Sequence, residues 1–435
     1  MQRRQLFKLG AAGLAGLCLR SLATGIPAAL LAGPRTAWGQ AGVMPQTLIL
    51  CTSPAGDPFN AHAPGCDVEG ASAPPDERLR RVNVALGETR VRAAQPWAAL
   101  PRAMRDRMAF VLHSTSVNAH PEHAKVMRLL GAAKGPGGNG EDMLVSLIAR
   151  HTAEPLGTIQ REPVNMGKAA MTSQGRVLGR VTPSQLVDLF AGADAALDDL
   201  TPLRDQTLDA LYADLKQTGT QAQRTFLDQY ARSQSQARQL GQSLGGLLAG
   251  IPADAEDPDT AADQVRAAVA MASLRVAPAY VVTIPFGGDN HADPGLVDES
   301  DQTVAGIAAL RLMWEELVRL GLQDEVTVCQ WNVFGRTFET RGNAGRNHNG
   351  LAHTAMLLGP RVQPGVFGAF VRQGDDWAAQ GIDPRTGRGV ANGGITPAES
   401  LASLGKTVCA AVGLDTATIN ADIRAGRVIQ AVVAG

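Results

Sequence analysis

The sequence predicts an α/β fold in which a mostly parallel sheet is sandwiched by helices. Short apolar, β-branched runs recur along the chain, and segments with helical periodicity lie between them. The runs are apolar throughout rather than alternating, which is typical of strands buried on both faces of a parallel sheet. With 45% hydrophobic and 19% charged residues in a chain of 435, a full core can be buried.

Five runs are expected to form the strands. They are Gln46–Thr52, Met108–His113, Pro278–Ile284, Glu325–Trp331 and His353–Leu358. The clearest helix is expected over Gln302–Leu320, where apolar residues recur at helical spacing. A second helix-like segment, Trp97–Arg107, precedes the second strand.

Residues 182–252 differ in character from the rest of the chain, because leucines recur there at helical spacing among Gln, Arg and Asp. Thr182-Pro183 and Thr201-Pro202 each predict an N-cap followed by proline at the first helical position. We therefore expect a single domain over 40–435 with an all-helical insertion at about 182–252. Thr260 is expected to cap the helix that follows the insertion.

The first 39 residues carry five basic residues and no acidic one. Arg3-Arg4 precede an apolar pair and a lysine, and the apolar runs that follow are shorter than a membrane span of about 20 residues. Ala37-Trp38-Gly39 predicts cleavage before Gln40. The segment 1–39 resembles a twin-arginine (Tat) signal peptide. This resemblance implies that the protein interacts with the Tat export machinery and is periplasmic or secreted. After cleavage, no membrane span is expected to remain. The alternative is a chance arginine pair on an amphipathic helix.

The whole chain has 40 basic and 41 acidic residues, so its net charge is close to zero. When residues 1–39 are removed, 35 basic and 41 acidic residues remain. A mildly acidic chain with 4% aromatic residues gives no reason to expect nucleic acid as a partner. The mature chain keeps Cys51, Cys66, Cys329 and Cys409, and their even number permits disulfides in an oxidising compartment. Cys51 and Cys329 lie inside apolar runs, which is more typical of buried thiols.

The candidate functional residues lie at the ends of the expected strands. In open parallel sheets, ligands bind outside the carboxyl ends of the strands. Polar side chains that follow or adjoin these ends are Asp57, His120, His123, Asp289, His291, Asp293, Asn332 and His348. Carboxylate and imidazole together suit zinc, manganese or iron, so one divalent metal is expected, with no metal at all as the alternative.

Four stretches resemble motifs of a known family. Gly288-Asp289-Asn290-His291 resembles W-D-T-H, Phe334-Gly335-Arg336-Thr337 matches E-F-G-R-T, Gly345–Asn349 matches G-R-D-H-N, and Gly359–Gly368 resembles a glycine-rich segment. With the Tat-like signal and the Gly56-Asp57-Pro58 loop, the chain resembles the domain of unknown function 1501 family. Those proteins are similar to the alkaline phosphatase and sulfatase superfamily. The resemblance therefore implies an alkaline-phosphatase-like fold and an ester hydrolase.

The resemblance also implies ligands, because the superfamily uses two metals that flank a nucleophile. Asp289, His291 and His348 match one metal site, and Asp293 has the usual four-residue offset and is expected to share that role. Asp57 matches the other site, but Asn332-Val333 stand where the superfamily has an Asp-His pair. Asn347 likewise stands where the family has Asp. Fewer anionic ligands predict weaker metal binding or none.

The expected nucleophile is a hydroxyl after the second strand, either Ser116 or Thr115, although these hydroxyls can instead cap the helix from Pro121. His120 and His123 are candidates for general acid/base roles or for metal ligands. Arg336 either binds a sulfate, phosphate or carboxylate or pairs with Asp289.

Two functions follow. One is a metal-dependent hydrolase of a phosphate or sulfate ester, carried by a small molecule or an envelope polymer. The other is a non-catalytic envelope binding or assembly protein on the same fold.

Overall fold

The computed structural model describes residues 44–53, 62–131, 133–134, 141–190, 200–218, 220, 244–248, 251, 259–341 and 345–434. The expected signal peptide and Asp57 lie outside these residues. The chain divides into two compact units, one with 33–180 and 275–435 and the other with 181–274. The second of these contains the expected helical insertion.

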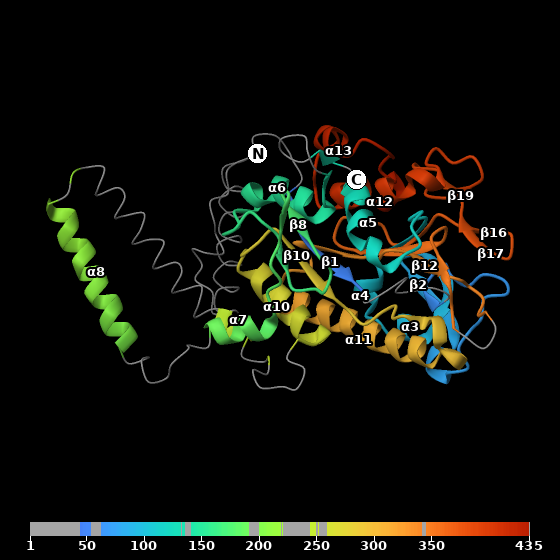
Figure 1. The fold of residues 1–435 in the computed structure, drawn as a ribbon, viewed down its shortest axis with the longest axis horizontal. Coiled ribbons are helices and arrows are strands. Elements are labelled where there is room, and N and C mark those ends of the chain that lie inside the picture. The colour runs from blue at the N-terminus through green and yellow to red at the C-terminus, as the bar shows by residue number, and fades with distance from the viewer. Residues whose placement is uncertain are drawn as a thin grey trace, which may run out of the picture. The chain divides into compact units, whose positions relative to one another are not determined.

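The larger unit is built on a seven-stranded sheet, which Figure 1 shows at its centre. In spatial order the strands are β15 (Gly365–Phe367), β4 (Met108–His113), β14 (His353–Leu358), β11 (Val326–Gln330), β1 (Thr47–Thr52), β10 (Ala279–Thr283) and β7 (Val164–Asn165). All neighbours are parallel except at β14, which runs antiparallel to both β11 and β4. The expected mostly parallel α/β sheet is confirmed.

The reversed direction of β14 determines which residues meet at one edge. His353, the first residue of β14, pairs with His113, the last residue of β4. The segment that precedes β14 therefore arrives at the same edge as the loops that follow the parallel strands. This edge is the carboxyl edge of the sheet.

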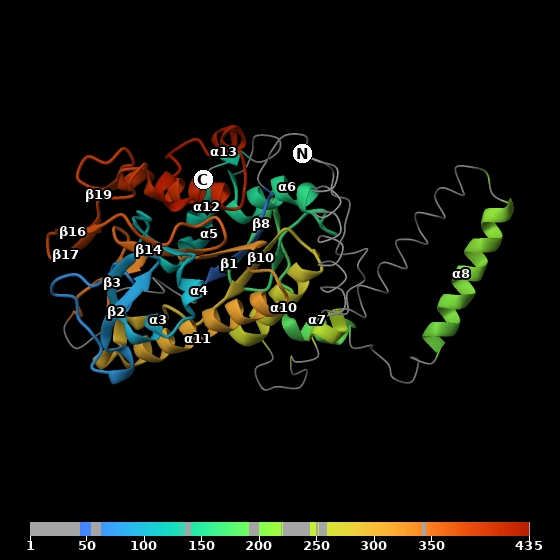
Figure 2. The ribbon, with the colours of Figure 1, turned by 180° about the vertical axis from the view of Figure 1, so that it is seen from behind.

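The strands are fully buried, which explains their continuous apolar sequences. Helices α5 (His123–Gly131), α6 (Leu144–Leu156) and α12 (Ser400–Ala411) pack together on one face of the sheet. On the other side lie α11 (Val297–Arg319) and α3 (Gln95–Ala98), and Trp97 of α3 packs against Phe110 of β4. Both ribbon views show helices on each side of the strands (Figures 1 and 2).

The remaining elements of this unit are short. Two-stranded pairs are β2 (Arg81–Leu86) with β3 (Thr89–Ala94), β5 (Ala133–Lys134) with β6 (Glu141–Asp142), β8 (Thr172–Ser173) with β9 (Arg176–Val177), β12 (Gly335–Arg336) with β13 (His348–Asn349), β16 (Phe370–Gln373) with β17 (Asp376–Ala379), and β18 (Gly381–Ile382) with β19 (Gly389–Val390). Two further helices are α4 (Arg102–Arg105) and α13 (Thr416–Asp422).

The expected elements differ from the structure mainly at prolines and at edges. The helix expected over Trp97–Arg107 is split into α3 and α4, because Pro101 has no backbone N–H to continue the ladder. The two-residue β7 and three-residue β15 at the sheet edges carry too short a pattern to be read from the sequence.

The smaller unit contains α7 (Pro183–Phe190), α8 (Leu200–Thr218) and α10 (Ala261–Ser273). Thr182 caps α7 through its Oγ1, which accepts from Gln185 N at 3.2 Å, and Thr260 accepts from Asp263 N at 3.2 Å, as expected. Thr201 is not a cap, because α8 already begins at Leu200. Proline is tolerated at 202, since the first N–H groups of a helix need no intrahelical partner.

The four cysteines in the described residues are all buried. Burial raises the pKa of the Cys51 and Cys329 thiols, the latter to about 12. These two therefore behave as small apolar side chains, as their sequence context indicates. Within the residues that the structure describes, no helix is both long and apolar enough to cross a membrane.

Candidate metal centre

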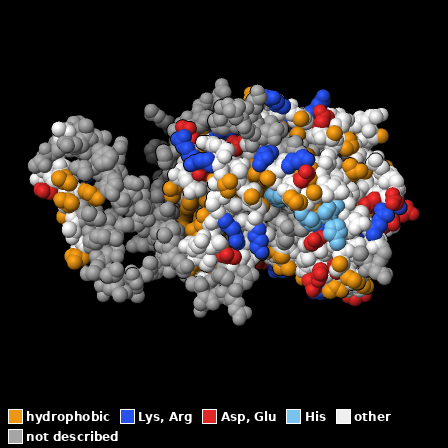
Figure 3. All heavy atoms as spheres, in the orientation of Figure 1, with side chains coloured by type: hydrophobic (Ala, Val, Ile, Leu, Met, Phe, Trp, Pro, Cys, Tyr) orange, Lys and Arg blue, Asp and Glu red, His pale blue; other side chains and the backbone are white. Residues whose placement is uncertain are grey.

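Three histidines and one aspartate converge at the carboxyl edge of the sheet. Potential ligand atoms of His120, Asp289, His291 and His348 all lie within 4.8 Å of one another. His348 Nε2 is 2.9 Å from His291 Nε2 and 3.0 Å from His120 Nε2. Asp289 Oδ1 is 3.6 Å from both His120 Nε2 and His291 Nε2. Figure 3 shows histidine side chains gathered in one patch on the surface. We call these four residues the histidine cluster.

A first backbone contact brings His348 to the loop after β10. Gly345 N donates to His291 O at 2.8 Å, and Arg346 N donates to Asn290 O at 2.8 Å. A Cβ at Gly345 would lie 1.9 Å from Asn290 O, so only glycine permits this approach. The segment that leads into β13 is therefore fixed against the Asp289–His291 loop.

A second backbone contact brings His120 to the same place. Gly350 O accepts from Thr115 N at 3.1 Å, from Ser116 N at 2.8 Å and from Ser114 Oγ at 2.9 Å. The loop after β4 is thus attached to the end of β13. His120, in the short 3-10 turn His120–Glu122, then faces His348.

The hydrogen bonds around the cluster determine which nitrogens carry lone pairs. His348 Nδ1 lies 3.0 Å from Asn118 O, and because a carbonyl only accepts, Nδ1 carries the proton and Nε2 of the neutral ring carries a lone pair. Arg336 Nη1 lies 3.4 Å from His291 Nε2, and a guanidinium only donates. The two Nε2 lone pairs therefore face each other at 2.9 Å.

Two facing lone pairs are unfavourable unless a proton or a metal cation lies between them. Burial lowers the pKa of His120 and of His348, which disfavours the protonated form. Three imidazole nitrogens and one carboxylate oxygen are a donor set that suits zinc. The Asn118 carbonyl that orients His348 is the kind of outer contact that metal-ligating histidines make. The residues present therefore fit a divalent metal.

Arg336 places a buried positive charge beside the cluster. Its side chain is 2% exposed, and Nη2 donates to Gly288 O at 2.9 Å and to Asp289 Oδ1 at 3.4 Å. Partial burial acts to raise the pKa of Asp289, but Arg336, His120 and His291 outweigh it and lower that pKa, so the carboxylate stays ionised. Arg336 thus pairs with Asp289, the second of the two roles expected for it, and also faces the cluster.

Phe334 forms an apolar wall of the site. Its ring centroid lies 3.9 Å from that of His348 and 4.9 Å from that of His120, and the Arg336 guanidinium lies 5.3 Å from it. Neither Phe334 nor Asn118 was expected at the site from the sequence. Phe334 belongs to the F-G-R-T motif, so the sequence did offer a reason to examine it. Asn118 acts through its backbone carbonyl, which every residue has, so no sequence pattern could have indicated its role.

Asp293 and His123 lie outside the histidine cluster. The Asp293 carboxylate accepts from Asp298 N at 3.0 Å and from Glu299 N at 2.9 Å, so it satisfies the first N–H groups of α11. His123 packs on Trp331 with ring centroids 5.5 Å apart, and burial lowers its pKa to about 4. Neither side chain is placed as a ligand beside the other four.

The hydroxyls after β4 bond to one another and to nearby carbonyls. Ser116 Oγ lies 3.3 Å from Ser114 Oγ, and Thr115 Oγ1 donates to Val117 O at 3.3 Å. The expectation that they cap the helix from Pro121 is wrong, because the N-cap is Ala119, which has no capping side chain. Ser116 is exposed and has a left-handed φ of +54°, an uncommon conformation for serine.

A buried ion pair holds the segment that carries His348. Arg346 is fully buried, its Nε lies 2.7 Å from Glu299 Oε2, and Nη1 donates to Thr337 O at 3.1 Å. His62 Nε2 lies 2.7 Å from Glu299 Oε1. Burial acts to raise the pKa of Glu299, but Arg346 and His62 lower it to about 2. The network fixes the β12–β13 connection to the start of α11.

His113 and His353 form a separate buried pair that joins β4 to β14. His353 Nδ1 lies 3.1 Å from His113 Nε2. Burial lowers the pKa of His113 to about 4 and the pKa of His353 well below its ordinary value. Both rings are therefore neutral parts of the core.

Comparison with known proteins gives one family. Residues 220–386 match the model described as "Protein of unknown function (DUF1501)". This match supports the DUF1501 family. The matched range includes Asp289, His291, Arg336 and His348 but not His120. No curated protein matches the chain.

Among solved structures, one titled "Crystal structure of Ps i-CgsB" is similar over 74% of this chain and 68% of that chain, with 10% identity and a TM-score of 0.28. A likeness at this level carries no conclusion about the fold or the reaction.

The position matched to a second metal is neutral in this chain. The Asn332 side chain is buried, its Nδ2 bonds to Ser53 Oγ, and its Oδ1 accepts from Val333 N at 2.8 Å. Val333 is buried as well. Asp57, the other expected ligand, lies outside the described residues. One metal site, at the histidine cluster, is what the described residues support.

Proposed function

We propose that the protein is a metal-dependent hydrolase of a phosphate or sulfate ester, on an alkaline-phosphatase-like fold with a single metal site. The observation that carries the proposal is the convergence of four ligand atoms within 4.8 Å beside the buried Arg336. His120, Asp289, His291 and His348 would hold the metal. A bound divalent ion supplies Lewis-acid polarisation of an ester oxygen.

Arg336 supports an anionic substrate. A guanidinium presents a planar set of donors that matches the oxygens of phosphate and sulfate. Arg336 is held by Gly288 O and stacked over Phe334, so its position is set before any substrate arrives. A fixed donor beside a metal site stabilises charge on a transferring group better than a mobile one.

The site is open to solvent. Side chains of His120, His291 and Asp289 are 36%, 42% and 61% exposed, while the Arg336 side chain is buried. An ester can therefore reach the cluster from the surface shown in Figure 3, with the charge of Arg336 behind it.

We also propose export through the Tat pathway to the periplasm or outside the cell. The support is the sequence of residues 1–39, with Arg3-Arg4 and a small-residue cleavage site. A site of imidazole and carboxylate ligands is compatible with a protein that is loaded with metal before export.

A non-catalytic envelope binding protein is the second candidate, and two observations favour it. The hydroxyls of Ser114, Thr115 and Ser116 are engaged with one another or with backbone carbonyls, and Asn332 replaces an anionic ligand at the second metal position. A protein of this kind would bind metal and an anion without turnover.

Metal content and ester turnover separate the two functions. Purified protein is analysed for zinc, manganese and iron, and assayed with p-nitrophenyl phosphate and p-nitrophenyl sulfate. The hydrolase is expected to bind one metal per chain and to lose both metal and turnover in His348→Ala. The matched control His151→Ala, whose imidazole pairs with Asp422, should keep both. Bound metal without turnover of either ester would favour the binding protein, and no bound metal would contradict the hydrolase.

A further inference from the structure

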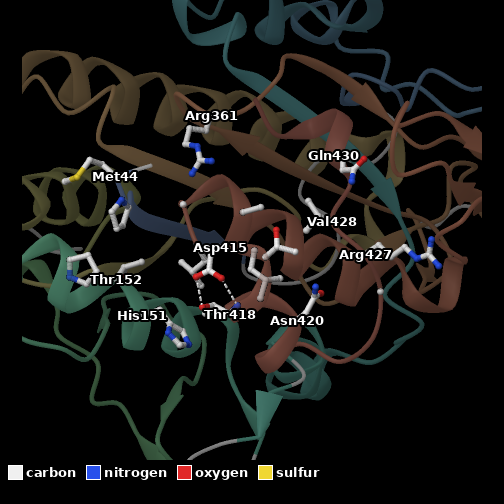
Figure 4. Close-up of a pocket in the computed structure, with 18 of the residues that line it drawn as sticks. Met44, His151, Thr152, Arg361, Asp415, Thr418, Asn420, Arg427, Val428 and Gln430 are labelled. Atoms are coloured by element: carbon white, nitrogen blue, oxygen red, sulfur yellow. Dashed lines mark hydrogen bonds between the residues drawn. The ribbon is translucent and has the colours of Figure 1, made fainter. Parts of the chain in front are cut away.

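A cavity lies at the edge of the sheet opposite the histidine cluster. It has a volume of about 1150 Å³, slightly above the range of typical small-molecule sites. Met44 lines it just before β1 begins, and Arg361 lines it just after β14 ends, so it is at the amino edge of the parallel strands. Residues of α6 and α13 complete the wall (Figure 4).

Arg361 is a cation without an acidic partner among the described residues. Its guanidinium points into the cavity in Figure 4, and its Nη1 is buried with no hydrogen-bond partner in the described structure. Burial lowers the pKa of Arg361. A desolvated guanidinium of this kind is stabilised when an anion binds it.

The backbone leaves room for this guanidinium. Gly413 has a φ of +99°, and a Cβ there would lie 3.0 Å from Arg361 Nη1 and 3.2 Å from Met44 O. A larger residue would therefore crowd the Arg361 head group.

A second buried cation, Lys406, contacts the cavity wall through Asn420. Lys406 is 4% exposed, and its Nζ donates to Asn420 Oδ1 at 2.7 Å. Asn420 lines the cavity. Because its oxygen is occupied by Lys406, the amide can offer its Nδ2 protons to a ligand.

The acidic side chains of this region are already engaged. Asp422 Oδ2 lies 2.5 Å from His151 Nε2 and 3.1 Å from Arg150 Nη2. The Asp415 carboxylate accepts from Thr418 N at 2.9 Å and from Thr418 Oγ1 at 2.7 Å, as the dashed lines in Figure 4 mark. Neither acid is bonded to Arg361 or Lys406 in the part of the chain that the structure describes.

The wall is part polar and part apolar. Pro155, Leu414, Ile419 and Val428 contribute apolar side chains to it. Pockets for small organic molecules combine apolar walls with a few convergent polar groups, as here.

We propose that this cavity binds a small organic anion with an apolar body, whose anionic group is held by Arg361. The site lies at the other edge of the sheet from the histidine cluster and does not depend on the proposed hydrolase activity. A ligand bound here would contact α6 and α13 but none of the cluster residues.

Two fluorescent probes of nearly the same shape test the proposal on the full chain. The first is 8-anilino-1-naphthalenesulfonate, an aromatic anion, and the second is N-phenyl-1-naphthylamine, its neutral analogue. The anion is expected to bind saturably and at least about tenfold more tightly than the neutral probe, since hydrogen bonds to charged groups contribute that much. Equal affinities of the parent chain for the two probes, or no saturable binding of the anion, would overturn the proposal.

Matched variants locate the bound anion. Arg361→Met is expected to weaken binding of the sulfonate about tenfold or more and to leave the neutral probe unchanged. Arg427→Met removes an exposed arginine that also lines the cavity but points away in Figure 4, and should change the affinity less than about twofold. Loss of sulfonate binding in Arg336→Met instead of Arg361→Met would assign the anion to the histidine cluster and overturn the inference.

Discussion

Arg336 and His348 are direct cross-strand partners in the β12–β13 pair, and this places a buried guanidinium beside an imidazole of the histidine cluster. One strand of this pair therefore supplies a proposed metal ligand, His348, and the other supplies a fixed cation, Arg336. The same hairpin is anchored behind the site by Arg346, which bonds to Glu299.

Arg336→Met is expected to lower kcat/KM for p-nitrophenyl phosphate by about 10- to 100-fold, because a charge-assisted hydrogen bond to the ester is lost. Zinc content should remain at one per chain, since Arg336 is not a ligand. Arg311→Met, which removes an exposed arginine paired with Glu315 on α11, serves as the control and should leave both values unchanged. An unchanged kcat/KM in Arg336→Met would show that this guanidinium does not bind the ester.

Gly345→Ala is expected to weaken zinc binding, because the new Cβ would lie 1.9 Å from Asn290 O and separate His348 from His291. Titration calorimetry with zinc measures the effect, and a loss of at least about tenfold is expected. Gly179→Ala is the matched control, since a Cβ there meets nothing within 4 Å. If both variants bind zinc like the parent chain, the backbone contact does not position the ligands.

Glu299→Gln is expected to lower the free energy of unfolding by roughly 3–5 kcal/mol, because it leaves the buried Arg346 without its counter-charge. Urea denaturation at pH 7 measures this. Glu316→Gln, which breaks a more exposed pair with Arg319, should cost less than about 1 kcal/mol.

The same carboxylate predicts a pH dependence. The folded pKa of Glu299 is about 2, below its ordinary value of 4.5, so its stabilisation is present above pH 4.5 and is lost as the pH falls toward 2. Unfolding free energies measured across this window should fall less steeply in Glu299→Gln than in the parent chain. Parallel curves would show that the ion pair is not formed.

His123→Phe is expected to stabilise the protein at pH 5. The folded pKa of His123 is about 4, below its ordinary 6.5, so the neutral ring favours folding above pH 6.5 and this contribution is lost as the pH falls toward 4. One such group changes the free energy of unfolding by about 1.4 kcal/mol per pH unit inside that window. Phenylalanine removes the dependence while keeping the contact with Trp331. A steeper decline in the variant would contradict burial of a neutral ring.

The sequence predicted the five central strands within one residue at either end, because each is a continuous apolar run that is buried on both faces. It also placed Asp289, His291 and His348 at one edge of the sheet. The sequence did not show that β14 is reversed, which is what carries His348 to that edge, since strand direction depends on connections that no local pattern records.

The prediction for Asp293 was wrong for a different reason. Its spacing from Asp289 suggested a ligand, but its carboxylate is used by the N–H groups at the start of α11. An acidic residue just before a helix and an acidic metal ligand look the same in one sequence. Likewise, His120 and His123 stand three residues apart, and only the fold shows that one faces His348 and the other faces Trp331.

The most direct test of a metal centre at His120, Asp289, His291 and His348 is X-ray absorption at the zinc edge on the zinc-loaded protein. The expected result is one zinc per chain, with three imidazole nitrogens and one carboxylate oxygen at about 2.0–2.2 Å. A chain that retains no zinc, or a spectrum that shows only water oxygens around it, would contradict the metal centre.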